Sequence, residues 1–572
     1  MKLPFSVVAA GLAALTALIA VTPCPAEAAS PPALHRRKGM VAADNESASQ
    51  AGAEILRQGG DAVDAAVATA LMLGVVQPFA SGLGGGGFAL VYRADGTPPY
   101  TLDFREVAPA AATANMYQDA KGNVVPGAST TGPKAAGVPG ELAGLFALHK
   151  RHGKLPWKTV VEPALRAARD GFPAGELLCQ RVARKRDDLA RWPALAAQFL
   201  HTDGTPILPG ERVRRLDLAK TLAVIARDGA AALYTGEVGK DLAAAMAHDG
   251  GLITRADLAA YAVKEREPLS ATYRGYTVLS MPPPSSGGAV LLQVLRVLEA
   301  TPLAPLGHNS GRYLHRLVEA VKHGFSDRAA VMGDPDFTPV PVAELLGDAA
   351  IAHIRAATLP QTVHPISTYG TRTAGATLPE DHGTSHLNVI DPAGNTIALT
   401  TTVNTVFGSF YVAGDTGLLM NDEMDDFVAK PGVPNAFGLV GREANAIAPG
   451  KRPLSSMTPT LVLKDGKVVL AVGASGGPTI ITGTLQVLLN VLDFGMDPQA
   501  AVEAPRVHHQ WMPEWLSVEP ELPFDVRETL ARRGHIVKVD TRTNAVQAIT
   551  AGPDGLRGAS DPSKQGRPAG VD

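Results

Sequence analysis

The sequence predicts a protein of the α+β class, with helices and strands in different stretches of one large chain. Its 572 residues are 45% hydrophobic and 19% charged, which is enough apolar material for a substantial core and excludes a disordered polymer. Apolar residues recur at three- and four-residue spacing from Ala43 to Val76, and residues 137–348 are rich in helical patterns. After about residue 358 the pattern changes to short, β-branched segments. The length allows several ordinary domains or one large sandwich with appendages.

The N-terminus has the features of a secretory signal peptide. Lys2 provides a positive charge, and Val7 to Val21 form an apolar core of suitable length. Ala26-Glu27-Ala28 then gives the small-x-small pattern that signal peptidase recognises, so residues 1–28 are the expected signal peptide. No later stretch reaches about 18 uninterrupted apolar residues, so we expect no membrane span after its removal.

Charge and cysteine content limit the partners and the location. The chain has 52 basic and 55 acidic residues and a net charge of −3, which gives no electrostatic footprint for nucleic acid. Cys24 leaves with the signal peptide, and the remaining Cys179 has no second thiol with which to form an intrachain disulfide. We therefore expect an exported protein. A mature chain with one cysteine and no disulfide favours the periplasm, and secretion into the medium is the alternative.

A glycine run at Gly82–Gly87 matches the G-x-G-x-x-G dinucleotide pattern, and Asp103 lies at a suitable distance for a ribose-binding acid. That pattern requires a strand before the glycines and a helix after them. Here a helix precedes the run and strands follow it, at Phe88–Tyr92 and Tyr100–Phe104. We therefore interpret the glycines as close backbone packing and expect no nucleotide cofactor.

The remaining elements follow in order along the chain. An exposed linker rich in Thr, Pro and Gly is expected at 361–380, after a helix-rich region that contains a loop at 282–288. The expected helices are 141–149, 216–227, 289–299 and 479–492, and the expected strands are 386–390, 396–403, 460–463 and 468–472.

Gly473-Ala474-Ser475-Gly476-Gly477 matches the G-x-S-x-G nucleophile elbow, with a strand before it and a helix after it. Acids and histidines follow at Asp493, Asp497, His508 and His535, so a hydrolase based on Ser475 is one candidate. The alternative is a tight turn whose backbone N–H groups bind an anion or form an oxyanion hole.

His382-Gly383-Thr384-Ser385-His386 follows the linker. Two histidines four residues apart suggest a metal, but they flank a glycine at the start of a strand and so do not share a helix face. No third ligand is nearby, and we expect no metal site. Considered alone, Gly383-Thr384 before a strand indicates no chemistry.

Several motifs in order resemble the γ-glutamyltransferase (γ-glutamyltranspeptidase) family. The resemblance extends from about Gly39 to Pro562, and the order of the motifs makes it specific. The motifs are Gly39-Met-Val-Ala, Asp103-Phe-Arg105-Glu-Val-Ala-Pro109, Thr384-Ser-His-Leu-Asn-Val-Ile-Asp, Thr402-Val-Asn404, Asn421-Asp-Glu-Met-Asp-Asp-Phe427, Lys451-Arg-Pro-Leu-Ser455-Ser456-Met and Ser475-Gly476-Gly477.

The resemblance implies a four-layer αββα sandwich of the N-terminal-nucleophile hydrolase type, made as an inactive precursor. It also implies autocleavage at Gly383-Thr384, giving a large subunit, 29–383, and a small subunit, 384–572, that remain together as a heterodimer. A threonine hydroxyl needs a base, and the new α-amino group, with an unperturbed pKa of roughly 7.7–8.0, can serve as one. Cleavage thus supplies nucleophile and base on one residue.

The family also implies roles for the other site residues, without a cofactor. Thr402 supports the nucleophile's hydroxyl, and the backbone of Gly476 and Gly477 forms the oxyanion hole. The substrate's α-carboxylate is expected at Arg105, Ser455 and Ser456, and its α-ammonium at Asn404, Glu423 and Asp426.

Three positions or segments merit comparison with the family. Ser385 stands where many members have a second threonine, and Glu423 where some have glutamine. Residues 428–441 resemble a lid loop found in a subset of members, with Phe437 where a tyrosine is often seen.

The implied activity is γ-glutamyl transfer from glutathione and related compounds to amino acids, peptides or water. A competing hypothesis is an acylase for glutaryl-cephalosporin-like substrates on the same scaffold. Such substrates lack the α-ammonium, so Glu423 and Asp426 would have no clear purpose. The Ser475 hydrolase and an inactive homologue that serves as a binding protein are two further hypotheses.

Overall fold

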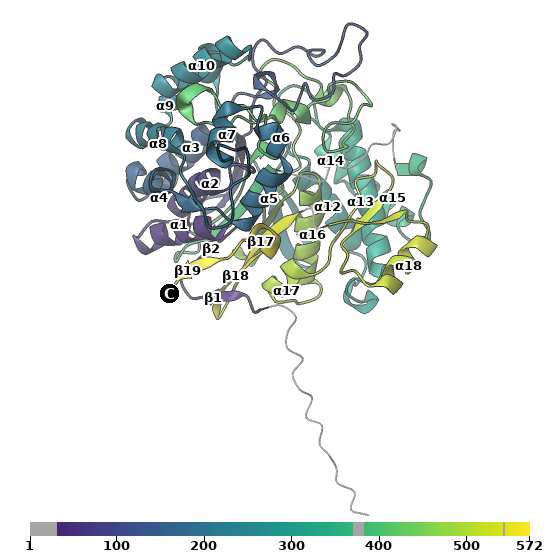
Figure 1. The fold of residues 1–572 in the computed structure, drawn as a ribbon. Coiled ribbons are helices and arrows are strands. Elements are labelled where there is room, and N and C mark those ends of the chain that lie inside the picture. The colour runs from purple at the N-terminus through teal and green to yellow at the C-terminus, as the bar shows by residue number, and fades with distance from the viewer. Residues whose placement is uncertain (1–30, 370–382, 542–543) are drawn as a thin grey trace, which may run out of the picture.

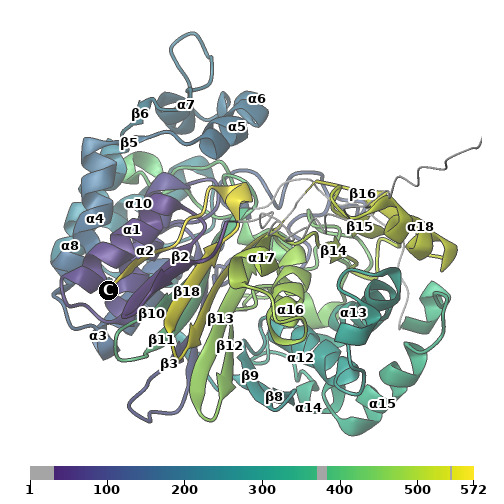
Figure 2. The ribbon, with the colours of Figure 1, turned by 90° about the horizontal axis from the view of Figure 1, so that it is seen from below.

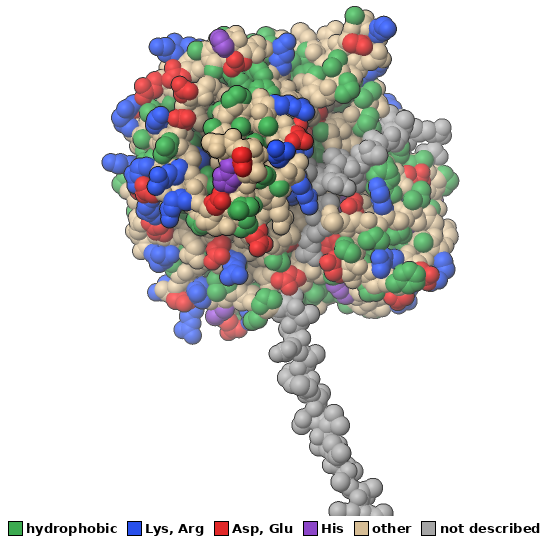
Figure 3. Space-filling model, viewed as in Figure 1, with side chains coloured by type: hydrophobic (Ala, Val, Ile, Leu, Met, Phe, Trp, Pro, Cys, Tyr) green, Lys and Arg blue, Asp and Glu red, His purple; other side chains and the backbone are tan. Residues whose placement is uncertain are grey.

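The computed structural model describes residues 31–369, 383–541 and 544–572. The expected signal peptide, most of the expected linker and His382 lie outside the described residues. Within the described part of the chain, no helix is both long and apolar enough to cross a membrane. On the face shown in Figure 3, acidic and basic side chains are intermixed, in keeping with the small net charge.

Two seven-stranded sheets form the centre of the molecule (Figures 1 and 2). The first has the order β19-β2-β10-β11-β3-β4-β7, with strands β2 (Gly39–Ala43), β3 (Gly86–Tyr92), β4 (Tyr100–Phe104), β7 (Lys264–Arg266), β10 (Gly383–Ile390), β11 (Thr396–Asn404) and β19 (Ala569–Val571). The second has the order β1-β18-β17-β13-β12-β9-β8, with strands β1 (Leu34–Arg36), β8 (Leu269–Tyr273), β9 (Tyr276–Ser280), β12 (Thr460–Lys464), β13 (Lys467–Ser475), β17 (Ala545–Gly552) and β18 (Gly555–Ser560).

The sheets pack face to face through a small apolar layer. Leu90 and Ala398 of the first sheet lie in one cluster with Leu279, Leu461 and Ala471 of the second. A second cluster continues this layer towards the other end of the sheets, and its members are Met40, Ala42, Ile390, Ile549 and Leu556. Alternate residues of each strand therefore face the partner sheet, as sheet-on-sheet packing requires.

Helices cover both outer faces, which completes four layers (Figure 2). Helices α1 and α2 contact the first sheet, and α12 and α16 contact the second. The helices are α1 (Glu46–Arg57), α2 (Ala62–Val76), α3 (Glu141–His152), α4 (Trp157–Asp170), α5 (Glu176–Arg184), α6 (Arg186–Leu189), α7 (Pro193–Phe199), α8 (Leu216–Asp228), α9 (Ala231–Tyr234), α10 (Glu237–Asp249), α11 (Arg255–Ala260), α12 (Gly287–Leu298), α13 (Gly311–Val331), α14 (Val342–Leu345), α15 (Asp348–Ala357), α16 (Thr479–Leu492), α17 (Pro498–Glu503) and α18 (Phe524–Arg532). The predicted αββα sandwich is confirmed.

Two smaller sheets lie outside the sandwich. One pairs β5 (Phe172–Pro173) with β6 (Arg212–Val213), and the other contains β14 (Val507–His508), β15 (Leu516–Val518) and β16 (Val537–Val539).

The helical pattern between Ala43 and Val76 forms two helices rather than one. Gly59 has a φ of 90°, in the left-handed region that favours glycine, and interrupts the pattern. Asp61 then caps α2, because its side chain accepts hydrogen bonds from the backbone N–H groups of Val63 and Asp64. Every residue of α2 is buried, which explains why its sequence has no polar face.

Both large sheets take strands from each side of Gly383-Thr384. The first sheet takes β2, β3, β4 and β7 from before this bond and β10, β11 and β19 from it or after it. The second takes β1, β8 and β9 from before it and β12, β13, β17 and β18 from after it. The two parts of the chain therefore share both sheets and the layer between them.

Candidate active site

Thr384 lies near the start of the central strand β10, where it pairs with Thr402 on β11. The two hydroxyl oxygens are 3.1 Å apart. Thr402 Oγ1 also donates to the Gly383 carbonyl oxygen at 2.8 Å and accepts from the Asn404 N–H at 2.8 Å. A hydroxyl has one proton and two lone pairs, so the Thr384 hydroxyl must be the donor to Thr402. The register of one strand pair thus orients both hydroxyls beside the Gly383-Thr384 bond.

The backbone packed around position 383 leaves room only for glycine. A Cβ atom there would lie 2.2 Å from the Thr405 carbonyl oxygen and 2.7 Å from that of Phe79. Both neighbours are backbone atoms that cannot rotate away. Any larger residue would therefore displace the chain at the bond that is expected to break.

A pocket opens beside Thr384 and contains nearly all of the residues expected from the sequence. Its volume is about 20 Å³, little more than one water molecule occupies. Of the expected residues, Gly383 and Gly476 are outside the lining. The lining residues are Arg105, Thr384, Thr402, Asn404, Glu423, Asp426, Phe437, Leu439, Ser455, Ser456, Met457, Gly477, Pro478 and Ile480.

Arg105 follows β4 and is fully buried between two carboxylates. Its guanidinium donates to Glu423 and Asp426, and its Nε donates to the Pro453 carbonyl oxygen at 3.3 Å. Burial raises the pKa of Glu423 well above its usual range, while the Arg105 charge opposes that rise. Glu423 Oε2 has no hydrogen-bond partner among the described residues. A buried acceptor without a partner is costly, and here it belongs to a residue that lines the pocket.

Glu106 is a third buried acid beside Arg105, at 4.0 Å from its guanidinium. Burial raises its pKa to about 8, so its carboxyl group is mostly protonated at neutral pH. The carboxyl groups that contact the guanidinium directly are those of Glu423 and Asp426.

The serine pair and the glycine pair approach the pocket from two further loops. Ser455 donates its N–H to the Pro284 carbonyl oxygen at 2.8 Å, so the loop at 282–286 supports it from behind. Gly476 and Gly477, between β13 and α16, have φ values of 130° and 57°. These conformations favour glycine and turn the backbone sharply at the helix start.

Residues 428–441, the predicted lid, contribute Phe437 and Leu439 to the pocket wall. Both side chains are buried. Gln510 donates to the Phe437 carbonyl oxygen at 3.1 Å, and Asp425 accepts from the Ala436 N–H at 2.8 Å. Position 437 therefore contributes an aromatic ring without a hydroxyl.

Ser475 does not have the surroundings of a hydrolase nucleophile. Its Oγ donates to Asp44 Oδ2 at 2.7 Å and accepts from Lys564 Nζ at 2.8 Å. Of the two histidines that the elbow interpretation offers, His508 bonds instead to Thr482 and Gln510, and His535 bonds to His315. Ser475 is fully buried, and it is not among the residues that line the pocket.

Sequence reasoning missed Asp44 and Lys564, which meet behind Thr384. Lys564 donates to the main-chain carbonyl oxygen of Thr384 as well as to Asp44 and Ser475. Asp44 follows the Gly39-Met-Val-Ala motif, and Lys564 lies just beyond the last matched residue, Pro562. Their nearness to matched motifs was the available signal, but nothing in the sequence pairs them.

One group of potential metal ligands lies elsewhere, on α13 and after α18. The ligand atoms of His315, Glu319 and His535 are within 4.8 Å of one another. His315 Nδ1 already bonds to His535 Nε2 at 2.8 Å, and Lys322 Nζ pairs with Glu319 at 2.8 Å. None of the three residues lines the pocket beside Thr384.

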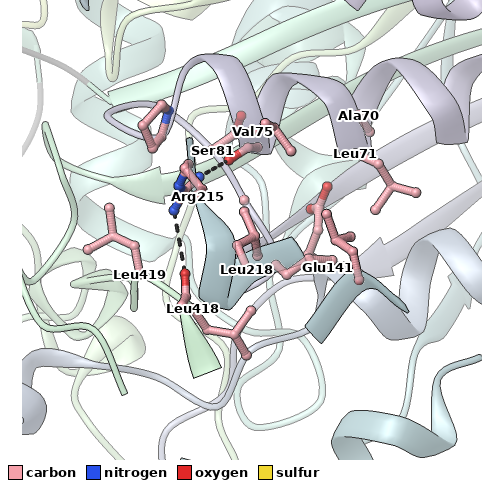
Figure 4. A pocket seen from close by; sticks show the side chains of 15 residues that line it. Ala70, Leu71, Val75, Ser81, Glu141, Arg215, Leu218, Leu418 and Leu419 are labelled. Carbon is pink, nitrogen blue, oxygen red and sulfur yellow. Dashed lines mark hydrogen bonds between the residues drawn. The ribbon is translucent and has the colours of Figure 1, made fainter. Parts of the chain in front are cut away.

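A second cavity lies between α2 and α8 (Figure 4). Apolar side chains dominate its wall, and the Arg215 guanidinium donates to the carbonyl oxygens of Gly74 and Gly417. Ser81 lines this cavity and donates to Ser385 Oγ at 3.3 Å. The residues that line this second cavity include no nucleophile with an adjacent base. We therefore assign the chemistry to the pocket that contains Thr384.

Glu141 in this second cavity gives a pH-dependence prediction. Burial raises its pKa to about 8 from 4.5. Between these values the folded chain holds a proton that the unfolded chain has lost, so stability falls as pH rises through this window. Glu141→Gln should remove that loss and raise the thermal midpoint relative to wild type, by about 2–4 °C more at pH 8.5 than at pH 5.

Thermal unfolding followed by circular dichroism across this pH range checks the prediction. Glu237→Gln is the matched control, because Glu237 also begins a helix but its side chain is 59% exposed. Parallel pH curves for wild type and Glu141→Gln would contradict the buried-proton explanation.

A four-layer αββα sandwich with a threonine near the start of a central strand is the arrangement of the N-terminal-nucleophile hydrolases. Residues 48–571 match the family described as Gamma-glutamyltranspeptidase, and the chain belongs to this family.

Individual relatives agree with this membership. The chain is 43% identical over 532 residues to a protein named glutathione hydrolase proenzyme from Pseudomonas sp. (strain A14), with 93% of this chain and 92% of the relative covered. It is 42% identical to the protein of the same name from Escherichia coli (strain K12), with 92% and 90% covered. Among solved structures, the cephalosporin acylase from Bacillus halodurans matches with a TM-score of 0.83 and 29% identity, over 96% of this chain and all of that one.

Proposed function

We propose that the protein transfers γ-glutamyl groups from glutathione and related compounds to amino acids, peptides or water. The observation that carries this proposal is that a threonine hydroxyl, one guanidinium and two acidic side chains line a single pocket. A γ-glutamyl group ends in an α-carboxylate and an α-ammonium. Arg105 complements the first charge, and Glu423 and Asp426 complement the second.

Maturation comes first in this proposal. Thr384 Oγ1 attacks the carbonyl carbon of Gly383, and the Thr402 hydroxyl, which donates to that carbonyl oxygen, stabilises the negative charge that develops there. The peptide C–N bond breaks, and the nitrogen keeps its amide hydrogen and takes up the proton released by the Thr384 hydroxyl, so that it becomes the new α-amine. Gly383 is then an ester on Thr384 Oγ1. Water then hydrolyses the ester, which leaves residues 29–383 and 384–572 as the two subunits.

Turnover reuses the same hydroxyl. The free amine of Thr384 accepts the hydroxyl proton as Oγ1 attacks the γ-carbonyl carbon of the substrate. Backbone N–H groups at Gly476 and Gly477 receive the oxyanion. The leaving amine takes the proton, and a γ-glutamyl ester remains on Thr384. Water or the amine of an acceptor then attacks this ester and releases the product.

Substrate binding must rearrange the pocket. A volume of about 20 Å³ does not hold a γ-glutamyl group, and Arg105 is already paired with both acids. In our proposal the zwitterion enters this cluster, so that its carboxylate meets Arg105, Ser455 and Ser456 while its ammonium meets Glu423, Asp426 and Asn404. Glu423 Oε2 then gains the partner that it lacks. Movement of the segment with Phe437 and Leu439 would supply the space.

The acylase hypothesis is supported by the structural similarity to a cephalosporin acylase. The charges in the pocket favour the γ-glutamyl proposal, because a glutaryl group lacks the ammonium and would add its own carboxylate to the two acids that already contact the guanidinium. Sites built around a charged or hydrogen-bonding group reject analogues that lack it by large factors.

A comparison of γ-glutamyl and glutaryl p-nitroanilides tests this choice. We expect kcat/KM to be at least about 100-fold higher for the γ-glutamyl substrate. Glu423→Gln should narrow that ratio, and Glu443→Gln, a change outside the pocket lining, serves as the control. Equal or better turnover of the glutaryl substrate would favour the acylase instead.

We further propose that the protein is exported and works in the periplasm, on the basis of the N-terminal sequence pattern. Fractionation of the native host with an antibody against the small subunit tests this location. A cytoplasmic small subunit would contradict it.

A further inference from the structure

One buried cation, which does not line the substrate pocket, contacts the main chain of the proposed nucleophile. Lys564 ends the short helix η7 (Pro562–Lys564). Its ammonium donates to the Thr384 carbonyl oxygen, to Ser475 Oγ at 2.8 Å and to Asp44 Oδ2 at 3.1 Å. These contacts use all three donors of the ammonium, so the side chain has a single defined position.

Asp44 completes the arrangement as the counter-charge. It is fully buried, and its other oxygen accepts from Gln547 Nε2 at 2.7 Å. Burial raises the pKa of Asp44, and Lys564 opposes that rise. Gln77 donates to the main-chain carbonyl oxygens of both Asp44 and Lys564, at 3.1 and 3.2 Å. A pair held this firmly by both side chains and backbone is a built feature of the site.

The Lys564 ammonium also lies close to the Thr384 nitrogen that becomes the base after cleavage. The carbonyl carbon and the α-nitrogen of Thr384 are both bonded to its Cα, so the Lys564 ammonium lies about 4–6 Å from the atom that becomes the α-amine. A like charge at this distance disfavours protonation by about one pKa unit or more. An unperturbed α-amine is largely protonated at pH 7 and is then no base.

We propose that Lys564 is a positioning residue for the reaction: it anchors Thr384 by its carbonyl oxygen, and its charge keeps the new amine in the free-base form at neutral pH, with Asp44 tuning that charge. This inference rests on the proposed function, in which the amine is the base. Ser475 acts as the link that joins the pair to the strand leading into Gly476-Gly477.

Other charged groups around Thr384 do not take this role. Arg105, Glu423 and Asp426 face it across the pocket, but they pair with one another, and Glu106 beside them is mostly protonated at neutral pH. Burial lowers the pKa of His386, two residues along β10, to about 3, so that its imidazole is neutral. Burial lowers the pKa of Lys564 and Asp44 opposes that change, while the smaller effects of Arg181 and Asp561 have opposite signs.

A serine–lysine dyad is the competing interpretation of the 2.8 Å contact between Ser475 and Lys564. In that chemistry the lysine must be neutral to accept the serine proton. Here Lys564 donates to three acceptors and pairs with Asp44, contacts that favour its charged form. Ser475 also has no exposed surface for a substrate.

The pH profile of kcat/KM tests the proposal, because its acid limb reports the base of the free enzyme. In full-length protein that has matured, Lys564→Met should move the acid limb up by about one unit or more. Asp44→Asn leaves the lysine charge without its counter-charge and should move the limb down. Lys564→Arg keeps the charge and should leave the limb near that of wild type. If Lys564 and Asp44 had a purely structural role, Lys564→Met and Asp44→Asn would both lower activity, but they would not shift the acid limbs in opposite directions.

The direction in which the acid limb moves distinguishes the proposal from its alternatives. Limbs unmoved or moved in the same direction by Lys564→Met and Asp44→Asn overturn the inference. If Lys564→Met does not mature, Asp44→Asn decides alone, and a limb that is unchanged or higher overturns it. N-terminal sequencing of the wild-type small fragment separates the two levels of the argument. A fragment that does not begin at Thr384 defeats the proposed function itself, whereas a correct fragment with unmoved limbs defeats only the role of Lys564.

Discussion

Thr384→Ala is expected to leave the chain uncut and without turnover. The variant lacks the hydroxyl that attacks Gly383, so neither the small subunit nor its N-terminal amine forms. After signal-peptide removal, a denaturing gel should show one band for residues 29–572, where wild type shows two, for 29–383 and 384–572. Turnover of a γ-glutamyl anilide should fall to background, a loss of at least about 10⁴-fold if the nucleophile and base act as one unit.

Thr384→Ser provides the control, since serine supplies the same hydroxyl and the same amine. It should still be cut at 383–384 and keep measurable activity. An uncut Thr384→Ala protein that retained turnover would remove Thr384 from the mechanism.

Arg105→Lys is expected to lower kcat/KM for γ-glutamyl substrates by about 100- to 1,000-fold. A guanidinium can serve two carboxylates and still present a flat, forked edge to a third, whereas an ammonium is a point charge. Disrupting a buried charge pair of this kind typically costs about 3–5 kcal/mol, in agreement with that factor. Cleavage at 383–384 should continue, because Arg105 makes no contact with the Gly383 carbonyl group.

Steady-state kinetics and a gel of the same sample check both parts. Arg266→Lys is the matched control, because Arg266 is also largely buried and pairs with acids outside the pocket lining, namely Asp103, Asp334 and Asp336. Near wild-type kcat/KM for Arg105→Lys would show that the substrate carboxylate binds elsewhere.

Much of the fold and of the candidate site could be predicted because the information is local. The strands at 100–104 and 396–403 and the helix at 479–492 agree with the structure to within one residue, since their periodicity and flanking turns are contained in a few residues. The motifs that carry Arg105, Asn404, Glu423, Asp426 and the serine pair come together in one pocket. Their roles in the reaction stay predictions.

The remainder depends on contacts between distant parts of the chain. Asp44 and Lys564 are separated by 520 positions, and no spacing rule connects them. Ser475 has the local pattern of a nucleophile elbow, yet strand β13 buries it against Asp44. The break between α1 and α2 needed knowledge of the Gly59 backbone conformation, which the apolar spacing on both sides masks.

The sharing of both large sheets between the two parts of the chain has a consequence for refolding. A precursor finds its strand partners within one molecule, whereas two separated pieces would have to meet in solution and build both sheets together. The cut proposed at 383–384 would therefore make folding a history-dependent property: easy once, before the bond breaks, and slow and concentration-dependent afterwards. The mature enzyme would rely on a high barrier to unfolding rather than on its capacity to refold, which agrees with the location proposed above, away from cytoplasmic chaperones.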